Sequence, residues 1–575
     1  MSDFDATPVV LSERSPSCLL SMTIHSQYST SSRSSRPWLI WLIWLIFALL
    51  WFGSLGHNAL IHPDEGRYAS ISLEMLQSGD WLTPRLNGLL YFEKPALPYW
   101  IGALSFKIFG VNEFAARFWP GLSGFLAVIA VGFTARRLWD EESGHLAALV
   151  MASSCWVVGN SHFLNLDTGL SFFLTSALCA FLLAQSDDTG LKERHRWMLI
   201  CWAAMAGATL SKGLIGIMIP GAVLVLYSII YRQFGFWRRL HLLSGLTLFL
   251  ALTAPWFILV SLKNPGFANF FFIHEHFERF LTTEHKRTGP FWYFVPYLLL
   301  GFLPWTTLLP GLLRFGMGRE GRGSLQSRRL LLLWAVFIFL FFSKSGSKLP
   351  SYILPMFPAL ALLAGHYLAQ LQPRALIRHL LLPALLWLAL LLTYPFIRRF
   401  SDSGTPFAVI QHMAGYIALG AMVFLTGTLF AWRLLALESK QTALMVLALA
   451  SLTALTLAAV GYDSYGQMKS SRALVAELNP STDTELFSVE YYDQTFPFYL
   501  RRNVTLVSYV DEFELGEKHE PARWIPTLDA FIPRWQAAPR ALAMMGEGTY
   551  QALRQRGVPM RVMYRDARRL VVGKP

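Results

Sequence analysis

The sequence has few charged residues for its length. Asp, Glu, Lys and Arg make up 15% of its 575 residues, whereas 54% are hydrophobic and the mean hydropathy is +0.40. A soluble protein of this length has a more polar composition. The composition therefore excludes a soluble globular protein, and much of the apolar surface must face lipid.

Cysteine is also scarce. Cys18 lies in the polar N-terminal stretch, and the other three lie inside apolar runs: Cys155, Cys179 and Cys201. Their number and spacing exclude a disulfide framework and a zinc site built from thiolates. A Gly-rich phosphate-binding loop is missing as well, so we expect no nucleotide pocket.

Apolar runs long enough to cross a membrane recur from Trp38 to about Val460. A hydrocarbon core roughly 30 Å thick needs about 20 apolar residues per helical span. The runs predict a polytopic α-helical membrane protein with about thirteen transmembrane helices. They lie near residues 38–56, 118–134, 145–161, 169–185, 197–211, 213–231, 240–262, 291–312, 329–343, 352–371, 379–396, 415–432 and 441–461.

The net charge of +13 follows a topological pattern. Most of the surplus Lys and Arg lie in short loops between apolar runs, such as Arg136 with Arg137 and Arg238 with Arg239. With a cytoplasmic N-terminus, every loop assigned to the inside carries at least two cations, as the positive-inside rule requires. The charge therefore indicates membrane lipids as partners and no nucleic acid. This topology depends on the short break at 211–213, whose loss would invert every later span.

Composition divides the chain into three regions. Residues 1–37 are polar and rich in Ser, which predicts a disordered cytoplasmic tail. Residues 38–461 form the predicted transmembrane domain. Residues 462–575 follow an odd number of spans and so lie outside. Strand-like runs at 486–492, 504–509, 541–545 and 561–564 alternate there with helical stretches, which predicts a C-terminal α/β domain.

Ionisable side chains gather in loops that this topology places on one outer face, at 57–117, 263–290 and 343–352. Cations outside the membrane oppose the positive-inside rule, and charges close to hydrocarbon are costly. A phosphate-bearing lipid accounts for both, because its headgroup lies at this depth and needs Lys and Arg donors. The motifs concerned are His62-Pro63-Asp64-Glu65-Gly66-Arg67-Tyr68, Tyr91-Phe92-Glu93-Lys94-Pro95, Asn160 to Asp167, His274 to Arg279 and Lys344 to Tyr352.

Several of these residues also have a simpler structural interpretation. Asp64 and Asp167 each stand before a predicted helix and are candidates for its N-cap. Lys94 is a candidate for an interfacial lysine whose ammonium reaches towards water. Glu93 and His274 are candidate ligands of a divalent metal, although a simple two-histidine site is excluded by the spacing of His274 and His276.

At these motifs the chain resembles the GT-C superfamily of integral-membrane glycosyltransferases and, within it, the bacterial lipid A aminoarabinose transferases. The pair Asp64-Glu65 is shared with protein O-mannosyltransferases and so indicates the superfamily. The stretches Tyr91–Pro95 and Lys348–Tyr352 resemble the narrower family. The resemblance extends from about Leu39 to the end of the chain and implies the GT-C fold.

The resemblance also implies a reaction. 4-Amino-4-deoxy-L-arabinose would pass from undecaprenyl phosphate to a phosphate of lipid A at the periplasmic face of the bacterial inner membrane, with inversion at the anomeric carbon. The product has less negative charge, which gives polymyxin resistance. The C-terminal domain would then be periplasmic, and the reaction would require no cofactor.

Within this reaction the candidate residues take different roles. We assign Lys94 and Arg279, with Tyr352 as a neutral donor, to the donor phosphate. Asp64 and Asp167 would orient or deprotonate the acceptor and stabilise positive charge at the sugar. The candidate catalytic residues are Asp64, Glu65 and Asp167; the candidate substrate-binding residues are Arg67, Tyr68, Tyr91, Lys94, Arg279, Lys348 and Tyr352.

Two other functions fit part of the pattern. A polyprenyl-phosphate-dependent hexosyl or mannosyl transferase that acts on protein or on another glycan would carry the same motifs. A lipid transporter also needs many spans, but it would hold its ionisable groups near the bilayer midplane. Here they gather at one surface, which favours a transferase.

Overall fold

The computed structural model describes residues 37–278, 289–320, 325–402 and 404–575. The chain divides into two compact units, residues 1–46 and residues 47–575. In the first unit the described part is the start of helix α1 (Pro37–Gly53). The predicted tail therefore lies outside the described residues except for Pro37.

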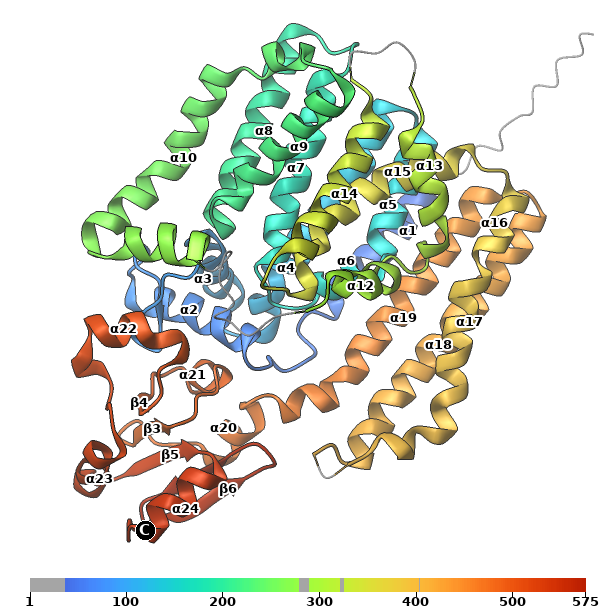
Figure 1. Cartoon of the computed structure of the whole chain (residues 1–575). Coiled ribbons are helices and arrows are strands. Elements are labelled where there is room, and N and C mark those ends of the chain that lie inside the picture. The colour runs from blue at the N-terminus through green and yellow to red at the C-terminus, as the bar shows by residue number, and fades with distance from the viewer. Residues whose placement is uncertain (1–36, 279–288, 321–324, 403) are drawn as a thin grey trace, which may run out of the picture. The chain divides into compact units, whose positions relative to one another are not determined.

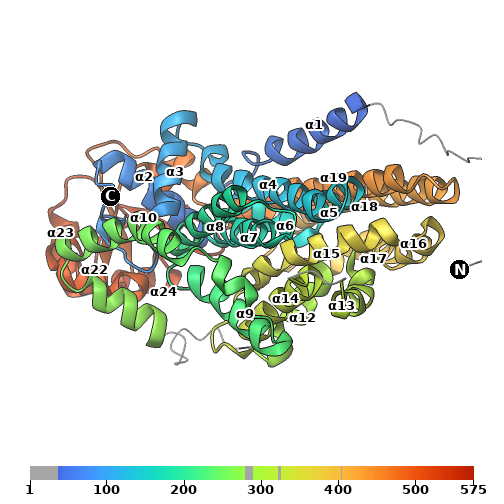
Figure 2. The ribbon, with the colours of Figure 1, turned by 90° about the horizontal axis from the view of Figure 1, so that it is seen from above.

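The second unit is dominated by helices (Figure 1). Between α1 and the C-terminal domain they are α2 (Asp64–Ser78), α3 (Leu97–Phe109), α4 (Glu113–Leu138), α5 (Glu141–Ser153), α6 (Cys155–Ser161), α7 (Asp167–Gln185), α8 (Leu191–Lys212), α9 (Ile215–Tyr231), α10 (Leu242–Lys263), α12 (Phe294–Gly301), α13 (Leu309–Met317), α14 (Ser327–Lys344), α15 (Phe357–Gln370), α16 (Pro373–His379), α17 (Leu381–Thr393), α18 (Phe407–Ala436) and α19 (Lys440–Met468). Shorter turns are η1 (Gly235–Arg239), η2 (Asn269–Glu278), η3 (Phe291–Tyr293), η4 (Thr306–Leu308), η5 (Pro350–Met356) and η6 (Tyr394–Phe400). The longest two, α18 and α19, run side by side (Figure 2).

Many of these helices suit a membrane. Within the described ranges, seven helices are long and apolar enough to cross one, and a bent pair adds an eighth if it counts as one span. Only 28% of the α10 span and 17% of the span Pro373–Phe400 are buried. Large apolar side chains such as Leu243 and Leu262 are exposed there, as expected of a surface that faces lipid. The chain is a multi-pass membrane protein, as predicted.

Two predicted spans are not continuous helices. The segment 145–161 breaks at Ser154, whose backbone is extended, so α5 and α6 are separate helices. The segment 291–312 is bent by 117° between its two helical parts. Pro304 follows α12 closely and has no N–H to continue the helix, which accounts for the interruption there.

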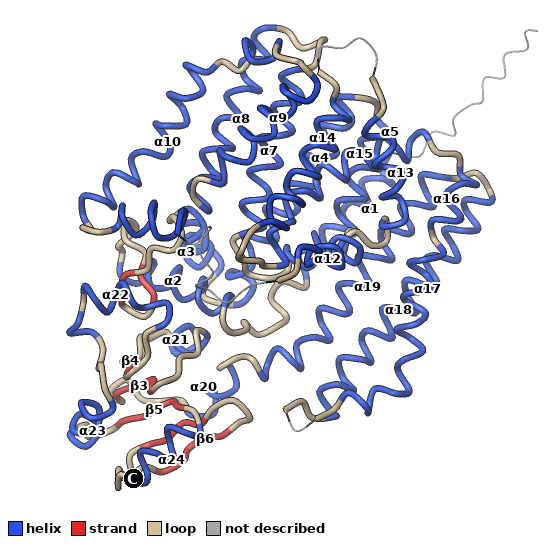
Figure 3. Tube along the Cα trace, in the orientation of Figure 1, coloured by secondary structure: helices blue, strands red, loops and turns tan. Residues whose placement is uncertain are grey.

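The C-terminal domain is built on a five-stranded sheet, shown in red in Figure 3. Strands β4, β3 and β5 are parallel, whereas β7 pairs antiparallel with β5 and with β6, in the order β4-β3-β5-β7-β6. The prediction of an α/β domain is confirmed, although β7 was not among the predicted strands. The strands are β3 (Glu485–Val489), β4 (Thr505–Val507), β5 (Ala541–Met545), β6 (Arg561–Arg565) and β7 (Leu570–Gly573); the helices and turns are α20 (Arg472–Leu478), α21 (Thr495–Leu500), η7 (Asp511–Phe513), α22 (Glu514–His519), η8 (Pro521–Arg523), α23 (Leu528–Ala537) and α24 (Glu547–Gln555).

Each face of this sheet has its own core. One face buries Phe531 and Trp535 of α23. The other packs against α2, α3 and the hairpin of β1 (Arg85–Leu86) and β2 (Leu89–Leu90), all of which belong to the first outer loop. This second core joins the C-terminal domain to the loop that carries the predicted catalytic motif.

Polar contacts reinforce this junction. Asn87 donates to the carbonyl oxygen of Val504 at 2.7 Å and accepts from its N–H at 2.8 Å. On α2, a Cβ added to Gly66 would lie 2.5 Å from the backbone of Gln494, so only glycine permits this approach. The first loop and the C-terminal domain therefore meet backbone to backbone.

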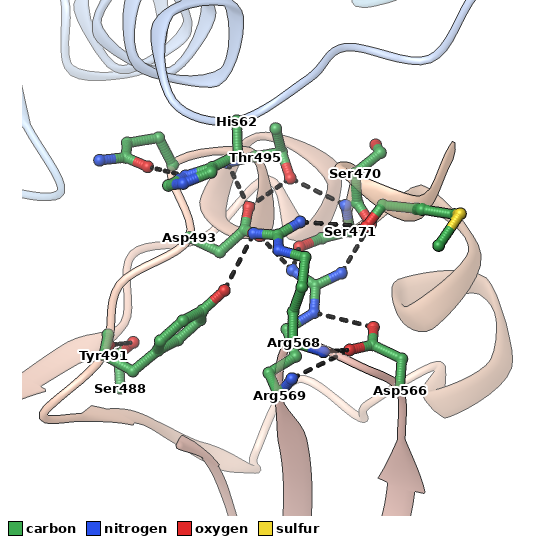
Figure 4. A network of polar contacts seen from close by, with 12 residues as sticks. His62, Ser470, Ser471, Ser488, Tyr491, Asp493, Thr495, Asp566, Arg568 and Arg569 are labelled. Carbon is green, nitrogen blue, oxygen red and sulfur yellow. Dashed lines mark hydrogen bonds and ion pairs between the residues drawn. The ribbon is translucent and has the colours of Figure 1, made fainter. Parts of the chain in front are cut away.

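A buried ionic network lies next to this contact (Figure 4). Asp493 is fully buried and forms ion pairs with Arg568, at 2.9 Å, and with Arg569. Arg569 also donates to the carbonyl oxygen of Ser470 at 2.6 Å. His62, the first residue of the motif that contains Asp64 and Glu65, contacts the side chain of Gln494 at 2.5 Å. The network thus links the end of the last long helix, the sheet and the first loop.

Candidate functional site

A cavity of about 370 Å³ opens where the helical bundle, the first loop and the C-terminal domain meet. Elements far apart in the sequence contribute to its wall. Its polar and charged lining includes Asp64, Arg67, Tyr68, Glu93, Lys94, Asn165, Asp167, Lys212, Ser351, Tyr352, Asp511, Glu512 and Glu514. Most of the residues predicted from the outer-loop motifs therefore share one cavity.

Asp167 is a carboxylate of this wall that is held by partners from two other segments of the bundle. It stands at the first position of α7, forms an ion pair with Lys212 at the end of α8, and accepts from the hydroxyl of Ser351 at 2.6 Å. The Lys212 ammonium lies 4.6 Å from the centre of the Tyr352 ring. Three segments thus fix one carboxylate, a cation and an aromatic ring. Asp167 does not cap its helix, because the side chain of Asn165 accepts from the Thr168 N–H instead.

Asp64 starts α2 and is less constrained. The α2 N-cap residue is Pro63 and no side chain caps the helix, so the N-cap interpretation of Asp64 is wrong. One Asp64 oxygen accepts from Arg67 at 3.2 Å, and 38% of the side chain remains exposed. This carboxylate is accessible to a molecule in the cavity.

Lys94 and Glu93 line the same cavity from the loop before α3. The Lys94 ammonium donates to the Glu93 carbonyl oxygen at 2.6 Å and lies 3.9 Å from its carboxylate. Tyr68 is partly buried, and its removal from water raises the pKa of its phenol and keeps it a neutral donor. The wall therefore offers both a cation and a neutral hydroxyl to an anion.

Glu65 does not belong to this wall, contrary to the assignment as a catalytic residue. Its carboxylate is 1% exposed and receives two hydrogen bonds from Arg117, at 2.6 and 2.7 Å. It also accepts from the backbone N–H groups of Ile61 and Leu164. Since Ile61 precedes Asp64 and Leu164 precedes Asp167, Glu65 ties together the two loops that carry the cavity carboxylates.

Two predicted substrate-binding residues also lie outside the lining. Tyr91 is buried in the core between α2 and the C-terminal domain. Lys348 is buried and its ammonium donates to the Ser345 carbonyl oxygen at 2.7 Å. Both shape segments that reach the cavity, but the assignment of direct substrate contact does not match their positions.

The remaining predicted residues, His274 and Arg279, belong to a segment that the structure describes only in part. Arg279 lies outside the described residues. His274 belongs to η2, but its side chain is outside the described part, so the metal pair of Glu93 and His274 stays a prediction. Within the described residues, His, Cys, Asp and Glu form no cluster of three that would hold a metal ion.

Five charged or hydroxyl-bearing residues of the described lining were not among the candidate site residues: Lys212, Ser351, Asp511, Glu512 and Glu514. Lys212 lies in the short break between two apolar runs. We interpreted this break from the sequence only as a turn between two spans, although a lone cation there also indicates a functional site. The three acidic residues lie in the C-terminal domain, where no local motif distinguishes them from surface carboxylates. Together with Asp64, Asp167 and Lys94, they make a wall of closely spaced cations and carboxylates, suited to a phosphate-bearing substrate.

Two family models match separate parts of the chain. Residues 38–276 match the family of dolichyl-phosphate-mannose-protein mannosyltransferases. Residues 472–574 match the aminoarabinose transferase C-terminal domain. The cavity takes residues from both matched regions.

Sequence relatives carry one shared name, undecaprenyl phosphate-alpha-4-amino-4-deoxy-L-arabinose arabinosyl transferase. The protein from Erwinia tasmaniensis is 38% identical over 326 residues, which cover 56% of this chain and 58% of that relative. The protein from Pseudomonas aeruginosa is 36% identical over 327 residues, which cover 56% and 58%. The matched stretch thus spans less than two thirds of these relatives.

Solved structures extend the likeness over almost the whole chain. ArnT from Cupriavidus metallidurans bound to undecaprenyl phosphate is 36% identical, with a TM-score of 0.89, and the match covers 94% of this chain and 98% of that chain. The same protein in the apo state gives a TM-score of 0.88 at 36% identity, with 93% and 98% covered. The chain therefore belongs to the aminoarabinose transferase family of GT-C integral-membrane glycosyltransferases.

Proposed function

We propose that this protein transfers 4-amino-4-deoxy-L-arabinose from undecaprenyl phosphate to a phosphate group of lipid A. The observation that carries the proposal is the cavity in which Lys94, Lys212 and Arg67 lie beside Asp64 and Asp167. The names of the sequence relatives and the undecaprenyl phosphate bound to ArnT support the same donor.

The reaction is a single displacement at the anomeric carbon. A phosphate oxygen of the acceptor attacks this carbon, and the bond to the undecaprenyl phosphate oxygen breaks, so that the leaving phosphate keeps the electron pair. Lys94, with Arg67 beside it, stabilises the charge that grows on this leaving group. The accessible carboxylate of Asp64 orients the acceptor or takes its proton, and the configuration of the sugar inverts.

Lys212 and Asp167 form the other side of this arrangement. Because Asp167 is held by both Lys212 and Ser351, its carboxylate keeps a fixed position. A fixed negative charge beside the sugar stabilises positive character at the anomeric carbon. Preorganisation of this kind requires no reorganisation during the reaction.

The orientation in the membrane is part of the proposal. The positive-inside pattern assigns the cation-rich loops, such as the turn η1, to the cytoplasm. The cavity and the C-terminal domain then face the periplasm, where the lipid A headgroup meets the inner-membrane surface. The modified lipid A has less negative charge and binds cationic polymyxins less well.

A reconstituted reaction tests the chemistry. Purified chain is mixed with a polyprenyl-phosphate aminoarabinose donor and lipid A, and the product is examined by mass spectrometry and by NMR of the anomeric proton. We expect one pentosamine on a lipid A phosphate, with inverted configuration. Lys94→Met should reduce the rate at least about 100-fold, as the loss of a charge-stabilising donor does elsewhere. Lys107→Met, on the exposed end of α3, is the matched control.

One observation favours a second candidate, a hexosyl or mannosyl transferase, because residues 38–276 match the mannosyltransferase family. The same assay with a polyprenyl-phosphate hexose distinguishes the two. Preferential use of the hexose donor would replace the pentosamine assignment by this alternative.

A further inference from the structure

The C-terminal domain gives the cavity only negative charge. Its contribution comes from η7 and the first two residues of α22, and consists of Asp511, Glu512, Glu514 and the apolar Leu515. The cations of the described lining, Arg67, Lys94 and Lys212, all come from the first loop or the helical bundle. The cavity therefore has a mixed wall on one side and an acidic wall on the other.

The acidic wall is more than a phosphate-binding site needs. Among the described lining residues, six carboxylates face three cations; the carboxylates are Asp64, Glu93, Asp167, Asp511, Glu512 and Glu514. A donor that brought only a phosphate would be repelled by this excess. A donor that carries a phosphate and an ammonium group is complementary to it, with the phosphate towards the cations and the ammonium towards the acidic wall.

Glu512 is the best positioned carboxylate of that wall. Its side chain is 4% exposed, although it lines the cavity, and burial raises its pKa to about 7. One oxygen accepts from the amide of Gln494 at 2.8 Å, and the other forms an ion pair with Arg67. Gln494 is held in turn by His62. Burying a carboxylate costs free energy unless partners compensate its charge. Gln494 and Arg67 do this for the two oxygens of Glu512.

The partner Arg67 also has bonding capacity to spare. Its Nε atom is buried and makes no hydrogen bond within the described structure, although the side chain lines the cavity. A buried donor without a partner indicates a missing ligand atom or water. The Arg67–Glu512 pair thus presents an open donor beside carboxylate oxygens, each of which has a second acceptor position.

We propose that the C-terminal domain is part of the substrate site, and that Glu512, flanked by Asp511 and Glu514, binds the amino group of the donor sugar and sets the preference for an amino sugar. This inference rests on the proposed function and deepens it. The ammonium donates to the Glu512 carboxylate, while a hydroxyl in the same place makes a weaker, uncharged hydrogen bond. The preference therefore depends on the charge at this position.

A simpler role for Glu512 is to neutralise Arg67 and hold the two domains together. The two roles differ in one measurable quantity, the preference between donors. A structural role affects an amino-sugar donor and a neutral one equally. Recognition of the ammonium affects the amino-sugar donor alone.

The experiment measures kcat/KM of the full-length protein for two donors with the same polyprenyl phosphate, one with 4-amino-4-deoxy-L-arabinose and one with L-arabinose. We expect Glu512→Gln to reduce kcat/KM for the amino-sugar donor by about 10- to 100-fold, the range for a hydrogen bond to a charged group. The value for the neutral donor should change by less than about threefold. Asp511→Asn and Glu514→Gln, at exposed positions, should shift the preference in the same direction without affecting folding.

Two further variants separate the outcomes. Glu512→Asp keeps the charge and should restore part of the preference. Glu517→Gln, a buried carboxylate on α22 that does not line the cavity, is the matched control and should leave the preference unchanged. An equal loss for both donors, or an unchanged preference in all three wall variants, would overturn the inference while the proposed function stands. A wild-type protein that prefers the neutral donor would overturn both.

Discussion

At the scale of single residues, the catalytic motif separates into carboxylates that face the cavity and a carboxylate that fixes the fold. Asp64 and Glu65 are neighbours in the sequence, yet Asp64 is 38% exposed at the cavity and Glu65 is enclosed by Arg117 and two backbone N–H groups. Adjacent residues on a helix point in directions about 100° apart, so they reach different surroundings. In this motif Asp64 is available for the reaction, whereas Glu65 positions the surrounding loops.

This division makes a prediction for the two neighbours. Asp64→Asn should abolish transfer and leave the thermal stability of the protein unchanged, because within the described residues this exposed carboxylate has Arg67 as its one partner. Glu65→Gln should lower the stability by about 3–5 kcal/mol, since it leaves Arg117 buried without its counter-charge. Thermal unfolding followed by tryptophan fluorescence and a transfer assay on the same preparations measure both effects. Equal stability losses in the two variants would contradict the division.

Lys212 gives a second prediction at this scale. Replacing it by Met removes the charge partner of Asp167 and the cation beside Tyr352. We expect kcat to fall by about 10- to 100-fold, as the loss of a charged hydrogen bond does. Lys263→Met is the control, because Lys263 pairs with Asp80 at 2.8 Å on a half-exposed surface. A Lys212 variant with the activity of this control would show that Asp167 needs no such partner.

The sequence predicted part of this site. A charged or aromatic side chain in an outer membrane loop indicates a functional site, because a charge close to hydrocarbon is costly. This rule identified Asp64, Arg67, Tyr68, Lys94, Asp167 and Tyr352. The same rule misled for Glu65 and Lys348, whose charges are satisfied by internal partners. It also missed Glu512, since a carboxylate in a soluble domain looks ordinary until the fold brings it to the cavity.

At the scale of elements, the first loop and the C-terminal sheet act as one assembly. The loop has little regular structure of its own beyond α2, α3 and a hairpin of two strands with two residues each, and it gains a core by packing on the sheet. Periodicity predicted the long apolar helices and the alternating strands and helices of the C-terminal domain. It did not predict the breaks at Ser154 and before Pro304, or strand β7, because tertiary contacts decide these features.

A substitution at Gly66 tests whether the close contact between α2 and the C-terminal domain matters for activity. A methyl group there would meet the backbone of Gln494 at 2.5 Å, and backbone yields less easily than a side chain. Gly66→Ala should therefore displace the C-terminal domain from α2 and reduce transfer severely. Gly79→Ala, at the other end of the same helix with open space around its Cβ, controls for general effects on α2, although its positive φ adds some strain of its own. Full activity in the Gly66 variant would exclude a role for this contact.

The buried network around Asp493 predicts a dependence of stability on pH. Burial opposes ionisation, but Arg569 and Arg568 outweigh it and lower the pKa of Asp493 below its ordinary value of 3.8. The unfolded chain then binds this proton at higher pH than the folded protein does. The stabilisation is therefore present above about pH 4 and is lost as pH falls through the lowered pKa of the folded state.

Asp493→Asn checks this directly. At pH 7 it should destabilise the protein by about 3–5 kcal/mol, because two arginines lose their buried counter-charge. The difference from the wild type should shrink as the pH falls below about 4. The measurement is the melting temperature of the wild type and of Asp493→Asn from pH 7 to below pH 4. Asp483→Asn, at an exposed position, is the control. A difference that stays constant with pH would assign the loss to something other than charge.

At the scale of the whole molecule, the site exists only when distant parts of the chain come together. The first loop, the start of α7, the end of α8, the turn η5 and the C-terminal domain each supply residues to one cavity, and none of these parts encloses it alone. Composition and apolar periodicity were sufficient to predict a multi-pass membrane protein with an α/β domain. They were not sufficient to predict which surfaces of the two domains meet, because that depends on particular contacts such as those of Gly66 and Asn87.

The most direct test of the proposed function is mass spectrometry of lipid A from a polymyxin-sensitive bacterium that lacks its own aminoarabinose transferase. The strain must make the donor lipid and is compared with and without this protein, and with the Asp64→Asn variant at equal membrane abundance. We predict a pentosamine on lipid A, and raised polymyxin resistance, with the wild-type protein alone. Unchanged lipid A with the protein present in the membrane, or the same modification by the Asp64 variant, would contradict the proposed reaction or its catalytic carboxylate.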